Sequence, residues 1–173
     1  MTAPSPSDED LMRRLQRGDQ DAYTELYRRW RLPIFRFLLR RTCSRSHAEE
    51  ALQETWTRLY RYRRSYDPGR PFRSWLYRVA SNAGHDARRP QPEQLFLRED
   101  LLEASYSTQQ QLQVRNTLIV ALHRLSPSER RLLLLVGEGF TSSEVSEILK
   151  IPPSTVRTHL SRARRSIREA LDG

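Results

Sequence analysis

The residues best suited to bind another molecule lie in one short stretch around residue 160, where arginines stand among small hydroxyl side chains. Arginine can hold phosphates or guanine edges, and serine and threonine hydroxyls can bond to bases or to the DNA backbone. The stretch therefore predicts contacts to duplex DNA. The candidate residues are Ser154, Thr155, Arg157, Thr158, Ser161, Arg162 and Arg165.

A helix-turn-helix is expected to position these side chains. Thr141, with Glu144 three residues later, has the spacing of a reciprocal N-terminal cap and predicts a short first helix. A tight turn over 150–152 follows, and Pro153 suits the first position of the second helix because it has no amide hydrogen to leave unpaired. The alternative is an ordinary helical hairpin with a solvated arginine face. The second helix has one apolar stripe, formed by Val156, Leu160, Ala163, Ile167 and Leu171.

The whole chain is predicted to be all-α, because apolar residues recur at helical spacing and no stretch alternates with period two for long enough to form a sheet. Hydroxyl residues followed three positions later by an acid or amide predict further helix starts at Ser7, Ser46, Ser107 and Ser126. The helices expected in the N-terminal part span residues 8–17, 20–42, 47–62 and 71–89.

These elements predict two small helical domains joined by a flexible linker. The N-terminal domain is expected over residues 1–89 and the C-terminal domain, with the helix-turn-helix, over 107–173. Residues 90–106 mix prolines, amides and acids and are expected to form the linker.

The composition agrees with a nucleic-acid partner. The 173 residues include 30 basic and 21 acidic side chains, for a net charge of +9, the sign of a surface that neutralises phosphates. Cys43 is the single cysteine, and with four scattered histidines it cannot build a zinc site, so no metal and no cofactor is expected. Without a signal peptide or a long apolar run, the chain is expected to be cytoplasmic and not to insert into a membrane.

An enzyme acting on DNA, such as a recombinase or a nuclease, would need a nucleophile or a cluster of metal-binding carboxylates. The sequence offers neither, so the protein is expected not to be an enzyme. The one acidic run, Asp8 to Asp10, is expected to cap the first helix.

Two C-terminal segments, Leu125–Val136 and Ile151–Arg165, resemble region four of bacterial sigma factors and also the terminal domain of LuxR-type regulators. The N-terminal half distinguishes these families. Ala48–Trp56 and Phe72–Asn82 resemble region two of the extracytoplasmic-function (ECF) sigma factors. A free-standing LuxR-type regulator remains the alternative, although its receiver domain would need a parallel sheet that this sequence does not predict.

The resemblance implies a chain that binds RNA polymerase core, directs it to a promoter and assists in melting the DNA. Region four implies that the helix-turn-helix binds the −35 element; His159 stands where arginine is usual, which puts one contact there in doubt. In the family, a Gln-Glu pair docks the clamp helices of the largest polymerase subunit. Here the matching exposed residues are Glu50, Gln53 and Glu54, on a helix whose expected buried stripe is Ala48, Leu52, Thr55, Trp56 and Leu59. A solvated acidic face is the alternative.

For the −10 element, the family uses the loop before the fourth helix and the exposed face of that helix. A cationic loop with an aromatic ring suits the capture of an unstacked base, although Tyr66 could equally be a packed loop residue. Phe72, Trp75, Leu76 and Val79 are expected in the core. The candidate −10 residues are Arg63, Arg64, Tyr66, Arg70, Asn82, Arg88 and Arg89. The implied partners are RNA polymerase core, promoter DNA and an anti-sigma factor, with no small-molecule substrate.

Overall fold

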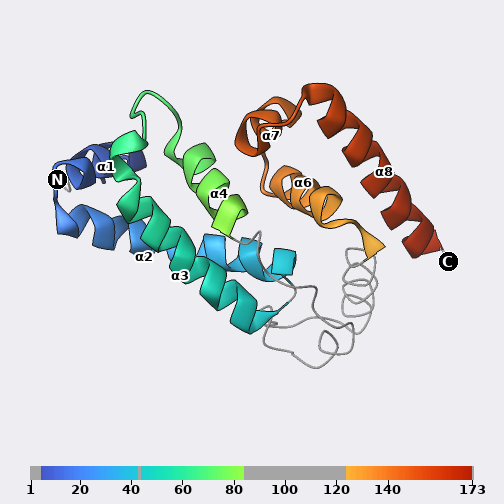
Figure 1. Ribbon diagram of the computed structural model, residues 1–173, viewed down its shortest axis with the longest axis horizontal. Coiled ribbons are helices and arrows are strands. Elements are labelled where there is room, and N and C mark those ends of the chain that lie inside the picture. Colours follow the sequence, from blue (N-terminus) through green and yellow to red (C-terminus); the bar gives the residue numbers. More distant parts are fainter. Residues whose placement is uncertain (1–4, 43, 84–123, 173) are drawn as a thin grey trace. The chain divides into compact units, whose positions relative to one another are not determined.

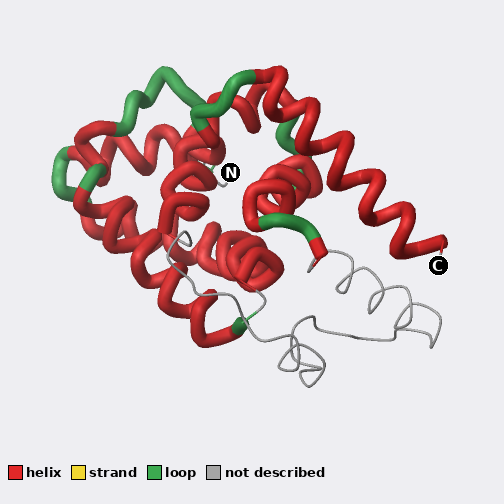
Figure 2. The backbone as a smooth tube through the Cα atoms, turned by 45° about the vertical axis from the view of Figure 1, so that its right-hand side comes forward, coloured by secondary structure: helices red, strands yellow, loops and turns green. Residues whose placement is uncertain are grey.

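The structure, a computed structural model, describes residues 5–42, 44–83 and 124–172, with side chains described up to Glu169. Every regular element in these residues is helical, which confirms the predicted fold class (Figures 1 and 2). The chain divides into two compact units, Met1–Arg88 and Arg89–Gly173. The predicted linker and the predicted helix start at Ser107 lie outside the described residues.

The N-terminal unit contains α1 (Asp8–Gln16), α2 (Gln20–Thr42), α3 (Arg45–Arg61), the short 3₁₀ helix η1 (Arg63–Ser65) and α4 (Phe72–Ala83). Helix α2 packs against α1, α3 and α4. Burying an apolar side chain stabilises the folded state by about 1.5–3 kcal/mol, and the unit buries such side chains from all four α-helices. They include Leu11, Leu15, Leu26, Phe37, Leu59, Phe72 and Leu76.

The N-terminal helix starts follow hydroxyl caps, with one shift from the predicted position. Ser7 caps α1 as expected, because its side chain accepts a hydrogen bond from the Asp10 amide at 3.1 Å. The predicted cap of α3 at Ser46 is wrong. Ser44 has the extended backbone of a cap and accepts from the His47 amide, so α3 begins at Arg45 rather than at His47.

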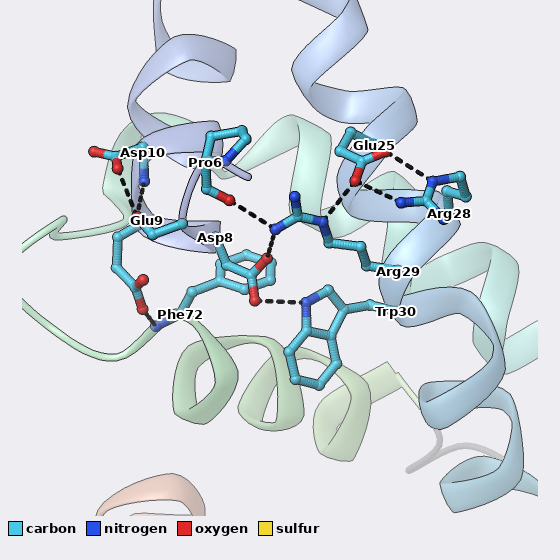
Figure 3. A network of polar contacts seen from close by, with 10 residues as sticks. Pro6, Asp8, Glu9, Asp10, Glu25, Arg28, Arg29, Trp30 and Phe72 are labelled. Carbon is cyan, nitrogen blue, oxygen red and sulfur yellow. Dashed lines mark hydrogen bonds and ion pairs between the residues drawn. The ribbon is translucent and has the colours of Figure 1, made fainter. Parts of the chain in front are cut away.

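The acidic start of α1 does more than cap its own helix (Figure 3). Asp8 accepts hydrogen bonds from Arg29 at 3.0 Å and from the Trp30 indole at 2.9 Å, which ties α1 to α2. Glu9 accepts from the main-chain amide of Phe72 at 2.9 Å. This amide opens α4 and has no partner within its own helix, so a carboxylate from α1 supplies the missing acceptor.

The C-terminal unit contains α6 (Pro127–Gly137), α7 (Ser142–Leu149) and α8 (Pro153–Asp172). Full reciprocal caps open α6 at Ser126 with Glu129 and α7 at Thr141 with Glu144, as predicted. Helices α6 and α7 both pack against α8. The buried side chains of this small core include Leu132, Leu135, Val145, Ile148, Val156, Leu160 and Ala163.

Candidate nucleic-acid interface

Helices α7 and α8 form the predicted helix-turn-helix, and the turn between them is fixed by local hydrogen bonds. Lys150 adopts the left-handed conformation, with φ 54° and ψ 46°, and its amide donates to the Ser146 carbonyl. The Ile151 amide donates to the same carbonyl at 3.2 Å, while the Ser146 hydroxyl donates to the Ile151 carbonyl at 2.6 Å. These bonds reverse the chain within three residues, and no motif in the sequence predicted this role of Ser146.

Helix α8 separates its apolar and polar side chains as predicted. Val156, Leu160 and Ala163 are buried and Ile167 is half-buried, whereas the side chain of Leu171 lies outside the described residues. Six of the candidate DNA-binding residues are exposed: Ser154, Arg157, Thr158, Ser161, Arg162 and Arg165. Thr155 is half-buried. The exposed face therefore presents hydroxyls near the start of the helix and guanidinium groups along it, an arrangement that can reach base edges and phosphates together.

His159 lies at the border of this face, toward α6. Its side chain is half-buried, and its Nδ1 atom is buried without a hydrogen-bond partner in the described residues. The hydrogen bond from the Ser126 hydroxyl lowers the pKa of the Glu129 carboxyl, and the charges of His159 and Arg162 lower it further. The half-buried position of His159 leaves a DNA contact at this residue an open prediction.

The loop before α4 differs from the prediction at its aromatic residue. Tyr66 is only 3% exposed, and its ring makes a T-shaped contact with Phe72 and a tilted contact with Trp75. Its hydroxyl donates a hydrogen bond to the Arg70 carbonyl at 2.6 Å. Its ring has no free face for a base, so the packed alternative is correct for this structure. Burial raises the pKa of the Tyr66 phenol to about 12.

Two aromatic side chains just before the loop are exposed, Tyr62 at 51% and Tyr60 at 37%, and the sequence reasoning missed both. Arg64 and Arg70, which were predicted as −10 residues, are also exposed in the loop that follows. Arg63 is half-buried, with its guanidinium carbon 4.2 Å from the centre of the Tyr60 ring. The alternation of arginine and tyrosine from Tyr60 to Tyr66 is the signal in the sequence, but it cannot tell which ring turns outward.

Helix α4 places its predicted core residues inward, with Phe72, Trp75 and Leu76 buried and Val79 half-buried. Asn82 is exposed, so its amide is available to a partner. Arg88 and Arg89 lie outside the described residues, as does the remainder of the helix predicted to reach residue 89.

Helix α3 presents the candidate polymerase-binding residues to solvent. Glu50 and Gln53 are exposed, and Glu54 is partly exposed with its carboxylate accepting from Arg58 at 2.5 Å. The predicted buried stripe is correct at Ala48, Thr55, Trp56 and Leu59 but not at Leu52, which is half-buried while Ala51 is buried. Ala51 also supplies the carbonyl that accepts from the Thr55 hydroxyl at 2.7 Å.

Two other kinds of site are absent from the described parts of the chain. Residues 5–42, 44–83 and 124–172 contain no group of three or more histidine, cysteine or acidic side chains that could hold a metal ion. In the same ranges, no helix combines the length and the apolar character needed to span a bilayer.

Two segments of the chain match families of known proteins. Residues 26–91 match Sigma-70 region 2, and residues 115–167 match Sigma-70, region 4. The first match includes α3, the loop and α4, and the second includes the helix-turn-helix. The candidate polymerase-binding and −10 residues thus fall in the region 2 segment, and the candidate −35 residues fall in the region 4 segment.

Two relatives match along most of the chain. The RNA polymerase sigma factor CarQ of Myxococcus xanthus is 32% identical over 165 residues, which cover 92% of this chain and 95% of the relative. The ECF RNA polymerase sigma factor SigW of Bacillus subtilis is 26% identical, over 92% of this chain and 94% of its own.

Solved structures show the same fold at lower identity. CnrH, solved in complex with the cytosolic domain of CnrY, matches with a TM-score of 0.73 and 22% identity, over 95% of this chain and 97% of its own. The sigma factor RpoE of Bartonella quintana, solved in complex with the anti-sigma factor NepR, matches with a TM-score of 0.68 and 19% identity, over 87% of this chain and 96% of its own.

Proposed function

The chain belongs to the ECF RNA polymerase sigma factors, and we propose that three different exposed surfaces of it bind polymerase core, the −35 element and the −10 element. It directs RNA polymerase to promoters and is not an enzyme. The free-standing regulator considered from the sequence is set aside, because residues 26–91 match sigma region 2. The observation that carries the proposal is that region 2 and region 4 each expose a polar face suited to a different partner.

The exposed face of α3 is the proposed docking site for polymerase core. Glu50 and Gln53 are exposed to solvent. Glu54 is partly exposed, and its carboxylate accepts one charge-assisted hydrogen bond from Arg58. Because Arg58 is one helical turn away, this bond restricts the Glu54 side chain to the surface without burying it. A polar face held in this way can meet basic and amide groups on the clamp helices of the largest subunit.

The exposed face of α8 is the proposed reader of the −35 element. Ser154 and Thr158 lie at the start of the helix, the part of a recognition helix that reaches base edges. The arginines that follow suit the phosphates on either side. Thr158 already donates its hydroxyl hydrogen to the Ser154 carbonyl at 3.0 Å, so toward DNA it would serve as an acceptor.

The loop after α3 and the exposed side of α4 form the proposed −10 surface, and Tyr62 takes the place of Tyr66 in it. Tyr62 offers a ring for stacking, and Arg64 and Arg70 offer charge to the strand backbone. Asn82 has the amide that pairs with an adenine edge. Strand separation would follow from capture of an unstacked base at this surface, without any chemical step.

An anti-sigma factor is the proposed regulatory partner. The Bartonella quintana relative was solved with such a protein bound. The α3 face proposed here to bind polymerase core is exposed in this chain, so a competing protein could cover it.

Transcription in vitro with polymerase core, this chain and a promoter library tests the proposal. We expect start-site-specific transcripts that need both proteins. The double variant Gln53→Lys with Glu54→Lys should abolish core association, whereas Glu147→Lys, at an exposed position of α7, should not. Normal core association by the α3 double variant would refute the proposed docking site. Tight sequence-specific binding to duplex DNA in the absence of core would refute the proposal that the chain recognises promoters together with polymerase.

A further inference from the structure

Helix α1 contacts both ends of the segment that carries the proposed −10 surface. At its C-terminal end, the Gln16 amide nitrogen donates to two main-chain carbonyls, Arg63 at 2.9 Å and Tyr66 at 2.8 Å. At its N-terminal end, the Glu9 carboxylate accepts from the Phe72 amide at 2.9 Å. The loop from residue 63 to residue 72 is therefore held at its beginning and at its end by one helix.

The spacing along α1 makes this arrangement possible. Glu9 and Gln16 are seven residues apart, which places them two turns apart on one side of an α-helix. Met12, between them, is fully buried, so this side faces the protein interior. A rigid helix that spans the loop can fix the separation of its two ends in a way that contacts within the loop cannot.

The bonds from Gln16 do not belong to regular secondary structure. The carbonyls of Arg63 and Tyr66 lie at the two ends of the η1 turn, and one side-chain amide satisfies both. Both contacts are partly buried. Losing the donor removes the Gln16 bond from the Tyr66 carbonyl and leaves the Arg63 carbonyl with only its 3.3 Å bond from the Tyr66 amide, which costs stability because the lost bonds are not exposed to water. The turn carries Arg64 and follows directly on Tyr62, and both residues are exposed.

We propose that α1 positions the −10 surface, with Gln16 and Glu9 as its positioning residues. By fixing both ends of the loop, they hold Tyr62, Arg64 and Arg70 in one arrangement before DNA arrives. Binding of an unstacked base then does not have to order the loop, and a base of the wrong shape cannot be accommodated by rearranging it. This inference rests on the function proposed above.

The test compares two pairs of variants in the full chain with polymerase core. Gln16→Glu keeps the size of the side chain and removes the donor. Gln20→Glu is its matched control, because within the described residues the Gln20 amide donates to the hydroxyl of the Tyr60 side chain rather than to a main-chain carbonyl. Glu9→Ala removes the acceptor at the other end of the loop. Glu9→Gln is the conservative replacement, since an amide oxygen can still accept from the Phe72 amide.

The readout is base discrimination at the −10 element. Promoters selected by the native holoenzyme are each paired with a copy that carries one changed −10 base, and the ratio of transcripts is measured well below the unfolding temperature. We expect Gln16→Glu and Glu9→Ala to lower this ratio about tenfold, and Gln20→Glu and Glu9→Gln to keep it within about twofold of the native value. Core association should stay unchanged in all four variants.

A purely structural role would lower the melting temperature and the amount of active protein without changing the ratio. Native discrimination in both Gln16→Glu and Glu9→Ala therefore overturns the inference, whatever their stability. Failure of the proposed function looks different, because the native chain with core would then give no promoter-specific transcript at all.

Discussion

Replacing Tyr66 with phenylalanine tests whether this residue is part of the core or part of the DNA-binding surface. The ring is 3% exposed, with centroids 5.2 Å from Trp75 and 6.0 Å from Phe72. Phenylalanine keeps these contacts and loses only the hydrogen bond to the Arg70 carbonyl. We expect the free energy of unfolding to fall by about 1 kcal/mol, the usual net contribution of one hydrogen bond. Tyr66→Ala, which also removes the ring, should lose about 3–5 kcal/mol.

Tryptophan fluorescence during urea denaturation measures this change directly. All three tryptophans, Trp30, Trp56 and Trp75, lie in the N-terminal unit, so the signal reports the unit that contains Tyr66. The pH dependence adds a second readout. The pKa of the phenol is raised from 10.0 to about 12, so its contribution to stability is complete below pH 10 and is lost as the pH rises toward 12. The difference between the native chain and Tyr66→Phe should narrow over that range.

Tyr62 is the contrasting position. It is 51% exposed, so Tyr62→Ala should change stability by no more than about 0.5 kcal/mol. The same change should weaken holoenzyme binding to a single-stranded −10 oligonucleotide by about 1–3 kcal/mol, the usual contribution of one stacked base. Tyr66→Phe should leave that affinity unchanged. The reasoning fails if Tyr66→Phe is as stable as the native chain, or if Tyr62→Ala binds the oligonucleotide normally.

Three further predictions concern other parts of the chain. Thr141→Ala removes the cap of α7 and should destabilise the C-terminal unit by about 1 kcal/mol, seen as a lower circular-dichroism melting temperature, while the tryptophan signal stays native. Arg157→Ala should reduce the salt dependence of holoenzyme binding to −35 duplexes by about one unit of slope if Arg157 contacts a phosphate, and an unchanged slope would exclude that contact. Hydrogen bonds from Arg28 and Arg29 lower the pKa of Glu25 from 4.5 to about 2, so its stabilising effect should be present above pH 4.5 and disappear as the pH falls toward 2. Melting temperatures of Glu25→Gln should therefore depend less on pH over that range, and a parallel curve would count against the pairing.

The features that the sequence predicted correctly depend on residues close together in the chain. The helix-turn-helix follows from a cap at Thr141, a proline at residue 153 and apolar residues at helical spacing, and each signal acts within about one turn of helix. Such signals work whatever the rest of the chain does. Exposure of Glu50, Gln53 and Arg157 was predicted for the same reason, since a helix with one apolar stripe must turn its other side to solvent.

Where local signals competed, the prediction was wrong. Ser44 and Ser46 are both suitable caps for α3, and the sequence favoured the one with an acid three residues later. In the structure, Thr42 donates to the Ser44 carbonyl at 3.0 Å, and the extended Ser44 starts the helix. The choice between two hydroxyls two residues apart depends on how the end of α2 leads into α3, and periodicity does not contain that information.

The sequence by itself determined which segments are helices and which of their faces are apolar, because these properties come from neighbouring residues. Only the tertiary structure decided that Tyr66 is buried and Tyr62 exposed, and that Glu9 and Gln16 of α1 hold a loop more than 40 residues away. Such contacts exist only after α1 has packed beside that loop, since two groups far apart in sequence meet only when the fold between them has formed.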